Sequence, residues 1–296
     1  MQVFSNQLFR SGAPNRSRIS LDKNNTFHYF TQVLSTLTAA NLVAELASRG
    51  RHCFTIDDAV AALGSSLVAT RAALRRLKDK GVVAMPYRGF HVIVPPEYRR
   101  LGCLPADQFV PELMKHLGQP YYVALLSAAR YHGAAHQQPQ IFYVMVAKNR
   151  SSIVCGAVRV HFIARRNVAE MSVARFNTPR GYVTVSSPEA TAFDLVGYHK
   201  HAGGLDNVAT VLVELTESLS SEGLFEMAKL SPTPWAQRLG YLLERVGAER
   251  KADPLACYVE RMAKETTPLL PGRTIMGARH DPRWKLHLNV DVESEV

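Results

Sequence analysis

Three arginines and a lysine lie close together in the segment Ser65–Lys80, which contains a single acidic residue, Asp79. Guanidinium groups bind phosphate and the guanine edge through paired N–H donors, so this pattern indicates recognition rather than catalysis. In a helix, Arg71, Arg75 and Lys78 fall on one face, and Arg76 lies on its flank. The segment therefore predicts a cationic helix face that meets nucleic acid.

Three consecutive helices are predicted to position this face. They span residues 39–49, 55–64 and 65–80. Thr55 is a natural N-cap for the second helix, and Gly64 is a natural stop. Ser65 or Ser66 caps the third helix, whose inner face is predicted to hold Leu67, Thr70, Leu74 and Leu77.

A β-hairpin is predicted to follow the third helix. Gly81 ends that helix, and residues alternate along Val82–Pro86 and Phe90–Val94, joined by the turn Tyr87–Gly89. Three helices and a hairpin make a winged helix-turn-helix, whose third helix enters the major groove. The predicted DNA-binding residues are Ser65, Ser66, Arg71, Arg75, Arg76, Lys78, Tyr87 and Arg88.

The charge distribution agrees with a nucleic-acid partner. The net charge is +10, and residues 1–100 hold 14 Lys and Arg against 6 Asp and Glu, whereas the remainder holds 21 against 19. A localised basic excess is typical of proteins that neutralise phosphate. The sequence has no apolar run long enough for a membrane span. Its 4 cysteines form no C-x-x-C pair, which predicts a reduced, cytoplasmic protein.

The last two thirds of the chain predict a mixed α/β domain, and the fold class is therefore α+β. Residues 1–37 are predicted to be a flexible or partly helical lead-in, 38–98 the winged helix and 99–296 the second domain, with the boundary within Pro95–Leu104. Helices are predicted over 107–118, 122–133, 192–200, 205–219, 235–246 and 254–264. Strands are predicted over 141–146, 158–164, 182–185 and 284–292. Ser187 and Pro188 are predicted to begin a helix.

Patterns that carry catalysis are missing from this sequence. It has no phosphate-cradling glycine loop and no G-x-S-x-G elbow. His132 and His136 are four apart, but Gly133 interrupts them and no H-E-x-x-H acid is present. We predict no catalytic residue, no metal and no cofactor, so the protein is not expected to be an enzyme.

With these segments in view, the chain resembles the AbiEi-type antitoxins of abortive-infection, type IV toxin–antitoxin systems. The resemblance covers about residues 38 to 292 and depends on the order of five segments. These are RGFHVIVPPEY (Arg88–Tyr98), LLSAARYHGAAHQQP (Leu125–Pro139), VTVSSPEATAFDLV (Val183–Val196), AQRLGYLLERVG (Ala236–Gly247) and RWKLHLNVDVE (Arg283–Glu293).

The resemblance implies a repressor that binds inverted repeats in its own promoter, with two copies on each operator. It assigns DNA contacts to Ser66, Arg71, Arg75, Arg76 and Arg88. It also implies that the second domain counteracts a nucleotidyltransferase-type toxin without needing a stable complex. It assigns no catalytic residue.

Two other classes of function stay open at this point. One is a ligand-sensing winged-helix regulator, in which Arg159, Arg165 and Arg166 around a predicted strand bind an anion. The other is a DNA-processing enzyme. Thermal-shift screening tests the first, and metal-dependent cleavage or nucleotide incorporation tests the second.

Overall fold

The computed structural model describes residues 37–134 and 140–294. Almost the whole of the predicted lead-in, and His136, lie outside these residues. The chain divides between Thr38 and Ala39, and Ala39–Val296 is one compact unit. The elements of the predicted winged helix and of the second region all belong to this unit.

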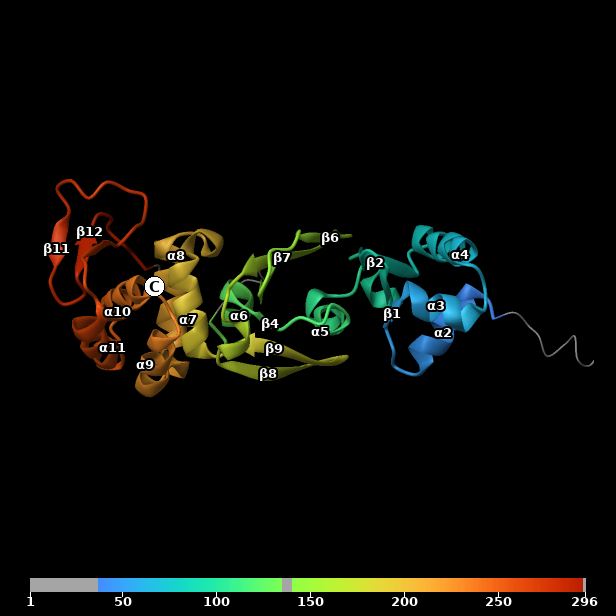
Figure 1. Cartoon of the computed structure of the whole chain (residues 1–296), viewed down its shortest axis with the longest axis horizontal. Helices are drawn as coiled ribbons and strands as arrows, with labels where there is room; N and C mark the ends of the chain where they lie inside the picture. The colour runs from blue at the N-terminus through green and yellow to red at the C-terminus, as the bar shows by residue number, and fades with distance from the viewer. Residues whose placement is uncertain (1–36, 135–139, 295–296) are drawn as a thin grey trace, which may run out of the picture. The chain divides into compact units, whose positions relative to one another are not determined.

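The unit begins with the predicted three helices and hairpin (Figure 1). The elements are α2 (Ala39–Ser48), α3 (Ile56–Leu63), α4 (Leu67–Asp79), β1 (Cys53–Thr55), β2 (Val83–Tyr87) and β3 (Phe90–Ile93). The three helices pack against one another. The strands form an antiparallel sheet in the order β1-β3-β2. Strand β1 was not predicted, because it has three residues and is defined by its pairing with β3.

Local capping signals begin and end these helices as predicted. The Thr55 hydroxyl accepts from the Asp58 N–H, and the Asp58 carboxylate accepts from the Thr55 N–H, which forms a capping box. Gly64 ends α3 with φ of 57°, in the left-handed region that favours glycine. Of the two serines proposed as the cap of α4, Ser66 is the cap, and its hydroxyl accepts from the Ala69 N–H at 3.2 Å.

A mixed six-stranded sheet follows, in the order β6-β7-β5-β4-β9-β8. Its strands are β4 (Tyr121–Val123), β5 (Phe142–Val146), β6 (Ile153–Cys155), β7 (Val158–Ala164), β8 (Val173–Thr178) and β9 (Gly181–Ser186). Strand β4 pairs antiparallel with β5 and parallel with β9, so it joins the two halves of the sheet. Alternate residues of β5 face different apolar clusters: Val144 faces α5 (Ala106–His116), and Met145 faces α7 (Pro188–Gly197).

Helices form the rest of the second region. They are α6 (Leu125–Tyr131), α8 (Leu205–Leu215), α9 (Ser221–Lys229), α10 (Thr233–Arg245) and α11 (Glu249–Met262), with 3-10 turns at Pro96–Tyr98, Val168–Glu170, His199–Ala202 and Thr216–Ser218. A small sheet of β10 (Thr267–Pro268), β12 (Leu286–Leu288) and β11 (Arg279–Asp281) closes the chain. The α+β fold class is confirmed.

One apolar cluster contains residues from both sides of the predicted boundary. Phe90 and Val92 of β3 belong to the same buried cluster as Leu104 and Phe109. The wing therefore packs on α5 through a continuous core. The division at Pro95–Leu104 stays a prediction.

Three predicted elements differ from the structure. The helix expected over 122–133 is a strand, β4, followed by the short helix α6, because the backbone turns at Leu125 with φ of 54°. In the strand expected over 284–292, only Leu286–Leu288 has strand partners. Helix α11 begins at Glu249 and contains Pro254 in its interior. Proline is favourable in the first turn of a helix, but its presence does not mean that the helix starts there. The predicted start of this helix at Pro254 was therefore five residues too late.

Candidate nucleic-acid interface

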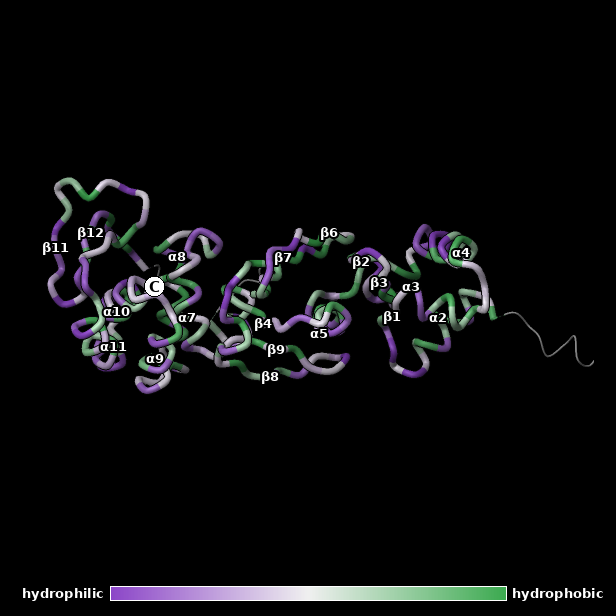
Figure 2. Tube along the Cα trace, viewed as in Figure 1, coloured by the Kyte–Doolittle hydropathy of each residue, from purple (hydrophilic) through white to green (hydrophobic). Residues whose placement is uncertain are grey.

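Helix α4 is held by one buried face and exposes the opposite face. Thr70, Leu74 and Leu77 are buried against α2, α3 and the wing, as predicted. Leu67, which was expected on the same face, is 40% exposed. This part of the prediction was wrong. Leu67 is the first residue of α4, and the buried residues of the helix begin one turn later, at Thr70. Hydrophilic and hydrophobic residues alternate along the coil of α4 (Figure 2).

The four predicted cations of α4 are all exposed: Arg71, Arg75, Arg76 and Lys78. Within residues 37–134 and 140–294, none of them has an ion pair or a hydrogen bond from its side chain. Other arginines of the unit are paired, as Arg51 is with Asp58 at 2.7 Å and Arg283 with Asp253 at 2.7 Å. The cations of α4 are therefore available to an external anion, and no internal contact would have to break.

The wing places a fifth cation beside them. Tyr87 pairs with Phe90 across a two-residue turn made by Arg88 and Gly89. Gly89, the second residue of the turn, has φ of 76°, which lies in the left-handed region that favours glycine. Its carbonyl accepts from the Ile56 N–H at 2.8 Å, so the turn is fixed to the start of α3. Arg88 is exposed at the tip.

A groove of about 890 Å³ lies between α4 and the wing. Cationic side chains from both elements line it: Arg71, Arg75, Lys78 and Arg88. The other lining residues include Leu74, Met85 and His91, and one acidic residue, Asp79. Burial lowers the pKa of His91, and the nearby charge of Lys78 lowers it further, so this histidine adds no positive charge at neutral pH. The positive charge of the groove comes from the four long side chains.

The remaining predicted residues have partners inside the protein. The hydroxyls of Ser65 and Thr70 are 2.8 Å apart, and the Ser66 hydroxyl is the helix cap. Arg150 donates to the Tyr87 hydroxyl at 3.5 Å. DNA contacts by these three predicted residues would need their hydroxyls to exchange or share these partners, so the contacts stay predictions.

Val68 is an exposed apolar residue of α4 that is not among the predicted DNA-binding residues. Val68 is 77% exposed in the first turn of the helix and lies on the same face as Arg71 and Arg75, three and seven positions further on. An apolar side chain can contact the methyl group of thymine, so a neutral residue can belong to a DNA-reading face. The sequence signal was the position of Val68 three residues before Arg71.

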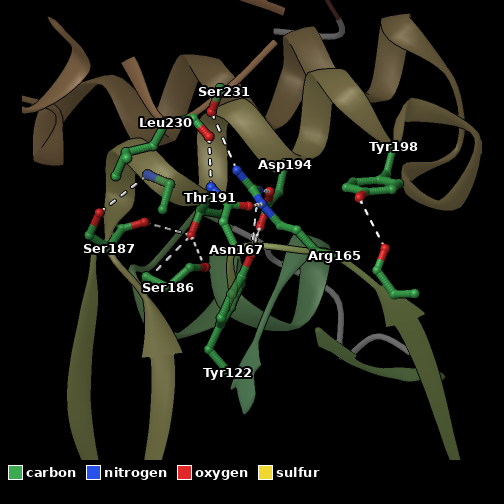
Figure 3. A network of polar contacts seen from close by, with 12 residues as sticks. Tyr122, Arg165, Asn167, Ser186, Ser187, Thr191, Asp194, Tyr198, Leu230 and Ser231 are labelled. Atoms are coloured by element: carbon green, nitrogen blue, oxygen red, sulfur yellow. Dashed lines mark hydrogen bonds and ion pairs between the residues drawn. The ribbon is translucent and has the colours of Figure 1, made fainter. Parts of the chain in front are cut away.

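A second polar cluster lies where β7 meets α7, and Figure 3 shows its contacts. Arg165 forms an ion pair with Asp194, and both side chains are buried. The Tyr122 hydroxyl donates to Asp194 at 3.0 Å. Arg165 also donates to Asn167 at 3.0 Å. Arg165 is thus held by internal partners, which contradicts its place in the anion site of the ligand-sensing alternative.

Arg159 and Arg166, the other two arginines of that alternative, are exposed. Arg159 lines a cavity of about 770 Å³, together with Arg130 and Asp107. Burial raises the pKa of Asp107. The hydrogen bond from Tyr131 and the charge of Arg130 lower it, but their effect is smaller than that of burial. Arg166 does not line this cavity.

No group of three or more metal-ligating side chains occurs in the described part of the chain. The ring Nε2 of His132 lies 2.7 Å from the Ser186 carbonyl, so this nitrogen already has a partner. Over the same residues, no helix has the length and apolar character needed to cross a bilayer.

Comparisons with known proteins find two matched segments and one similar structure. A family model described as "Transcriptional regulator, AbiEi antitoxin" matches residues 41–94, and another, "AbiEi antitoxin C-terminal domain", matches residues 122–245. Among solved structures, the chain is similar to the RV2827C protein from Mycobacterium tuberculosis. The two are 18% identical, with a TM-score of 0.59 over 84% of this chain and 90% of that chain, which shows a shared fold. No curated protein matches the chain.

Proposed function

Because the chain belongs to the AbiEi antitoxin family, we propose that it represses its own operon by binding inverted repeats in duplex DNA through α4 and the wing. The family joins a transcriptional regulator to an antitoxin. We further propose that residues 38–98 form the DNA-binding domain and 99–296 the antitoxin domain. The segments matched by the two family models, 41–94 and 122–245, support this division.

The observation that carries the proposal is the groove between α4 and the wing. Four cationic side chains line this groove, and none of them has an ion-pair partner within the described ranges. They can therefore bind the phosphates of a polyanion such as DNA. In a winged helix, the third helix lies in the major groove, and the wing contacts a neighbouring backbone. We assign Arg71 and Arg75 to the major groove and Arg88 to phosphate.

A salt titration on two duplexes tests these assignments. The upstream region of the gene and a scrambled duplex of the same length are titrated by fluorescence anisotropy. Arg75→Ala is expected to cost about 1–3 kcal/mol on the operator and less on the scrambled duplex, because a base contact carries sequence preference. Arg88→Ala is expected to weaken both duplexes alike and to reduce the salt slope by about 1.

Arg250→Ala on α11 is the matched control, since Arg250 is also exposed and lies outside the groove. If Arg250→Ala weakens binding as much as Arg75→Ala does, binding follows net charge alone, and the α4 assignment is wrong. A loss of operator preference in Arg88→Ala would contradict the role of the wing.

Inverted repeats need two copies of the protein on one operator. We propose a homodimer, or cooperative binding through DNA, with half-sites separated by a whole number of helical turns of about 10 base pairs. Inserting about five base pairs between the half-sites turns one to the opposite side of the duplex. This insertion is expected to abolish tight binding of two copies, whereas an insertion of about ten restores it.

The antitoxin role is proposed to reside in the second domain and to oppose a nucleotidyltransferase-type toxin without a stable complex. The triple variant Arg71→Ala, Arg75→Ala and Arg88→Ala separates the two roles. It is expected to lose repression of a promoter fusion and still to restore growth of cells that express the toxin. Failure to restore growth, with normal protein levels, would contradict the division of roles.

A second candidate is supported by the cavity lined by Arg130, Arg159 and Asp107. An anionic metabolite there would make the protein a ligand-sensing regulator. Thermal-shift screening of small carboxylates and phosphates tests this function, with Arg159→Ala as the variant that should lose any response.

A further inference from the structure

Three of the four cysteines meet in one apolar cluster, although they are far apart in the sequence. Cys103 is buried in the cluster that joins the wing to α5, and Cys53 and Cys155 pack against it. Cys257 is exposed on α11. The scattered spacing in the sequence therefore conceals a group of neighbouring thiols.

The backbone places two of these thiols near each other. The Ala157 N–H donates to the Leu101 carbonyl at 2.8 Å. Next along both segments, a Cβ built on Gly156 would lie 2.9 Å from the Gly102 Cα, so the two glycines are in contact. Cys103 and Cys155 are the next residues along these two contacting segments, and both belong to the same apolar cluster, so the fold brings their thiols close together.

We propose that Cys155 and Cys103 form a peroxide-sensitive thiol pair, in which Cys155 is the attacking thiolate and Cys103 the resolving thiol. Cys155 is half-buried at the end of the edge strand β6, where a small oxidant can reach it. Cys103 belongs to the same apolar cluster and is buried, so external thiols have less access to it than to Cys155.

The surroundings of the two sulfurs assign these roles. Interaction with the Cys103 thiol lowers the pKa of Cys155, assisted by the charge of Lys78 and the Met85 N–H. The same interaction, and burial, raise the pKa of Cys103. Burial raises the pKa of Cys53 to about 12, which keeps that thiol protonated. The thiolate is the reactive form, so Cys155 reacts first.

The reaction balances with a hydroperoxide as the oxidant. The Cys155 thiolate attacks the terminal peroxide oxygen, an S–O bond forms, and the O–O bond breaks to release an alcohol, or water from hydrogen peroxide. Cys155 becomes a sulfenic acid. The Cys103 sulfur then attacks the Cys155 sulfur, the S–O bond breaks, and the hydroxide leaves with the Cys103 proton as water. The two thiols lose two electrons, and the peroxide gains them.

Oxidation would reach the proposed DNA interface through the Met85 N–H, which donates to Cys155, and through the electrostatic attraction between Cys155 and Lys78. Strand β6 packs beside β2 (Figure 1), and Met85 of β2 lines the groove between α4 and the wing. The disulfide removes the thiolate that accepts from the Met85 N–H and that interacts with Lys78 of α4. This consequence depends on the proposed function, whereas formation of the disulfide does not.

Peptide mapping of the full-length protein tests the pair directly. Trypsin places the four cysteines in four separate peptides, His52–Arg71, Leu101–Lys115, Ser151–Arg159 and Ala252–Arg261. After treatment with hydrogen peroxide and blocking of free thiols, the expected product is Leu101–Lys115 linked to Ser151–Arg159, with two hydrogen atoms lost. Dithiothreitol should reverse the link.

Three variants assign the chemistry. Cys103→Ser should leave a sulfenic acid on Cys155 that dimedone traps, because the resolving thiol is missing. Cys155→Ser should abolish the link, and Cys257→Ser, the exposed control, should leave it unchanged. Unlinked Cys103 and Cys155 peptides after peroxide treatment would overturn the proposal, and so would a dominant link that contains Cys53.

DNA affinity is a separate measurement on the same samples. Oxidised wild type is expected to bind duplex DNA about fivefold or more tightly than the reduced protein, because the disulfide removes the negative charge of Cys155 near Lys78, whereas Cys155→Ser is unaffected by peroxide. Equal affinity of both wild-type forms would overturn the coupling to the wing. If the reduced protein binds no duplex, the repressor proposal fails, and the peptide map still decides the fate of the thiol pair.

Discussion

Replacing Arg165 with leucine should destabilise the second region strongly and in a pH-dependent way. Arg165 is the countercharge of Asp194, which is 0% exposed. Arg165 also stacks over Trp235 at 5.5 Å. It donates to Ser231 at 3.4 Å (Figure 3). Leucine keeps part of the apolar contact and removes the charge, so Asp194 is left as an unpaired carboxylate in the core.

The magnitude follows from that unpaired charge. Removing one partner of a buried ion pair costs about 3–5 kcal/mol in the free energy of unfolding. Burial already raises the pKa of Asp194 to about 6, against the lowering effects of Arg165 and of the Tyr122 hydrogen bond. A folded-state pKa above the unfolded value means that stability falls as pH rises through that interval. Without Arg165 the pKa rises further, so the deficit of the variant should grow from pH 5 to pH 8.

Urea unfolding at pH 5 and pH 8 measures this difference. Arg166→Leu is the matched control, because Arg166 is the next residue and is exposed; it should cost less than about 0.5 kcal/mol at either pH. The double variant Arg165→Leu, Asp194→Leu should recover much of the stability, since an apolar pair leaves no charge in the core. A pH-independent loss in Arg165→Leu, or no recovery in the double variant, would refute the electrostatic explanation.

Two further predictions concern the elements that position the two regions. Leu74→Asp should unfold the winged helix, because Leu74 is 2% exposed and an isolated buried carboxylate has no partner. Val68→Asp changes a residue of the same helix that is 77% exposed and should leave the melting curve nearly unchanged; equal effects would show that the faces of α4 are assigned wrongly. Gly240→Ala should destabilise the protein by about 1–3 kcal/mol, because its Cβ would lie 1.9 Å from Trp284 Cζ3. Urea unfolding with an unchanged midpoint would contradict this close approach.

The winged helix could be predicted because its signals are local. Thr55, Ser66 and Gly64 act within one turn of the helix ends that they define. The apolar positions of α4 repeat within a single helix, so its exposed face follows from its buried one. The hairpin likewise depends on a turn of two residues between Tyr87 and Phe90.

The second region was less predictable because its elements depend on distant partners. Tyr121–Val123 is a strand through its pairing with β5 and β9, and its apolar residues fit a helix equally well when read alone. Helix α9 was not predicted, although Ser220 caps it and Leu224, Met227 and Ala228 are buried at helical spacing. The three-residue strands β1 and β6 have no pattern long enough to identify them.

The candidate functional residues also differ in whether their surroundings can be predicted from local sequence. Arg165 and Arg166 are neighbours that add equally to the net charge, but one is buried against a carboxylate 29 residues away and the other is exposed. Only the packing of β7 on α7 distinguishes them. The pairing of Cys103 with Cys155 likewise requires two segments to meet. The exposed face of a single helix can therefore be predicted from its residues, as it was for the cations of α4, whereas a site assembled across elements needs the fold first.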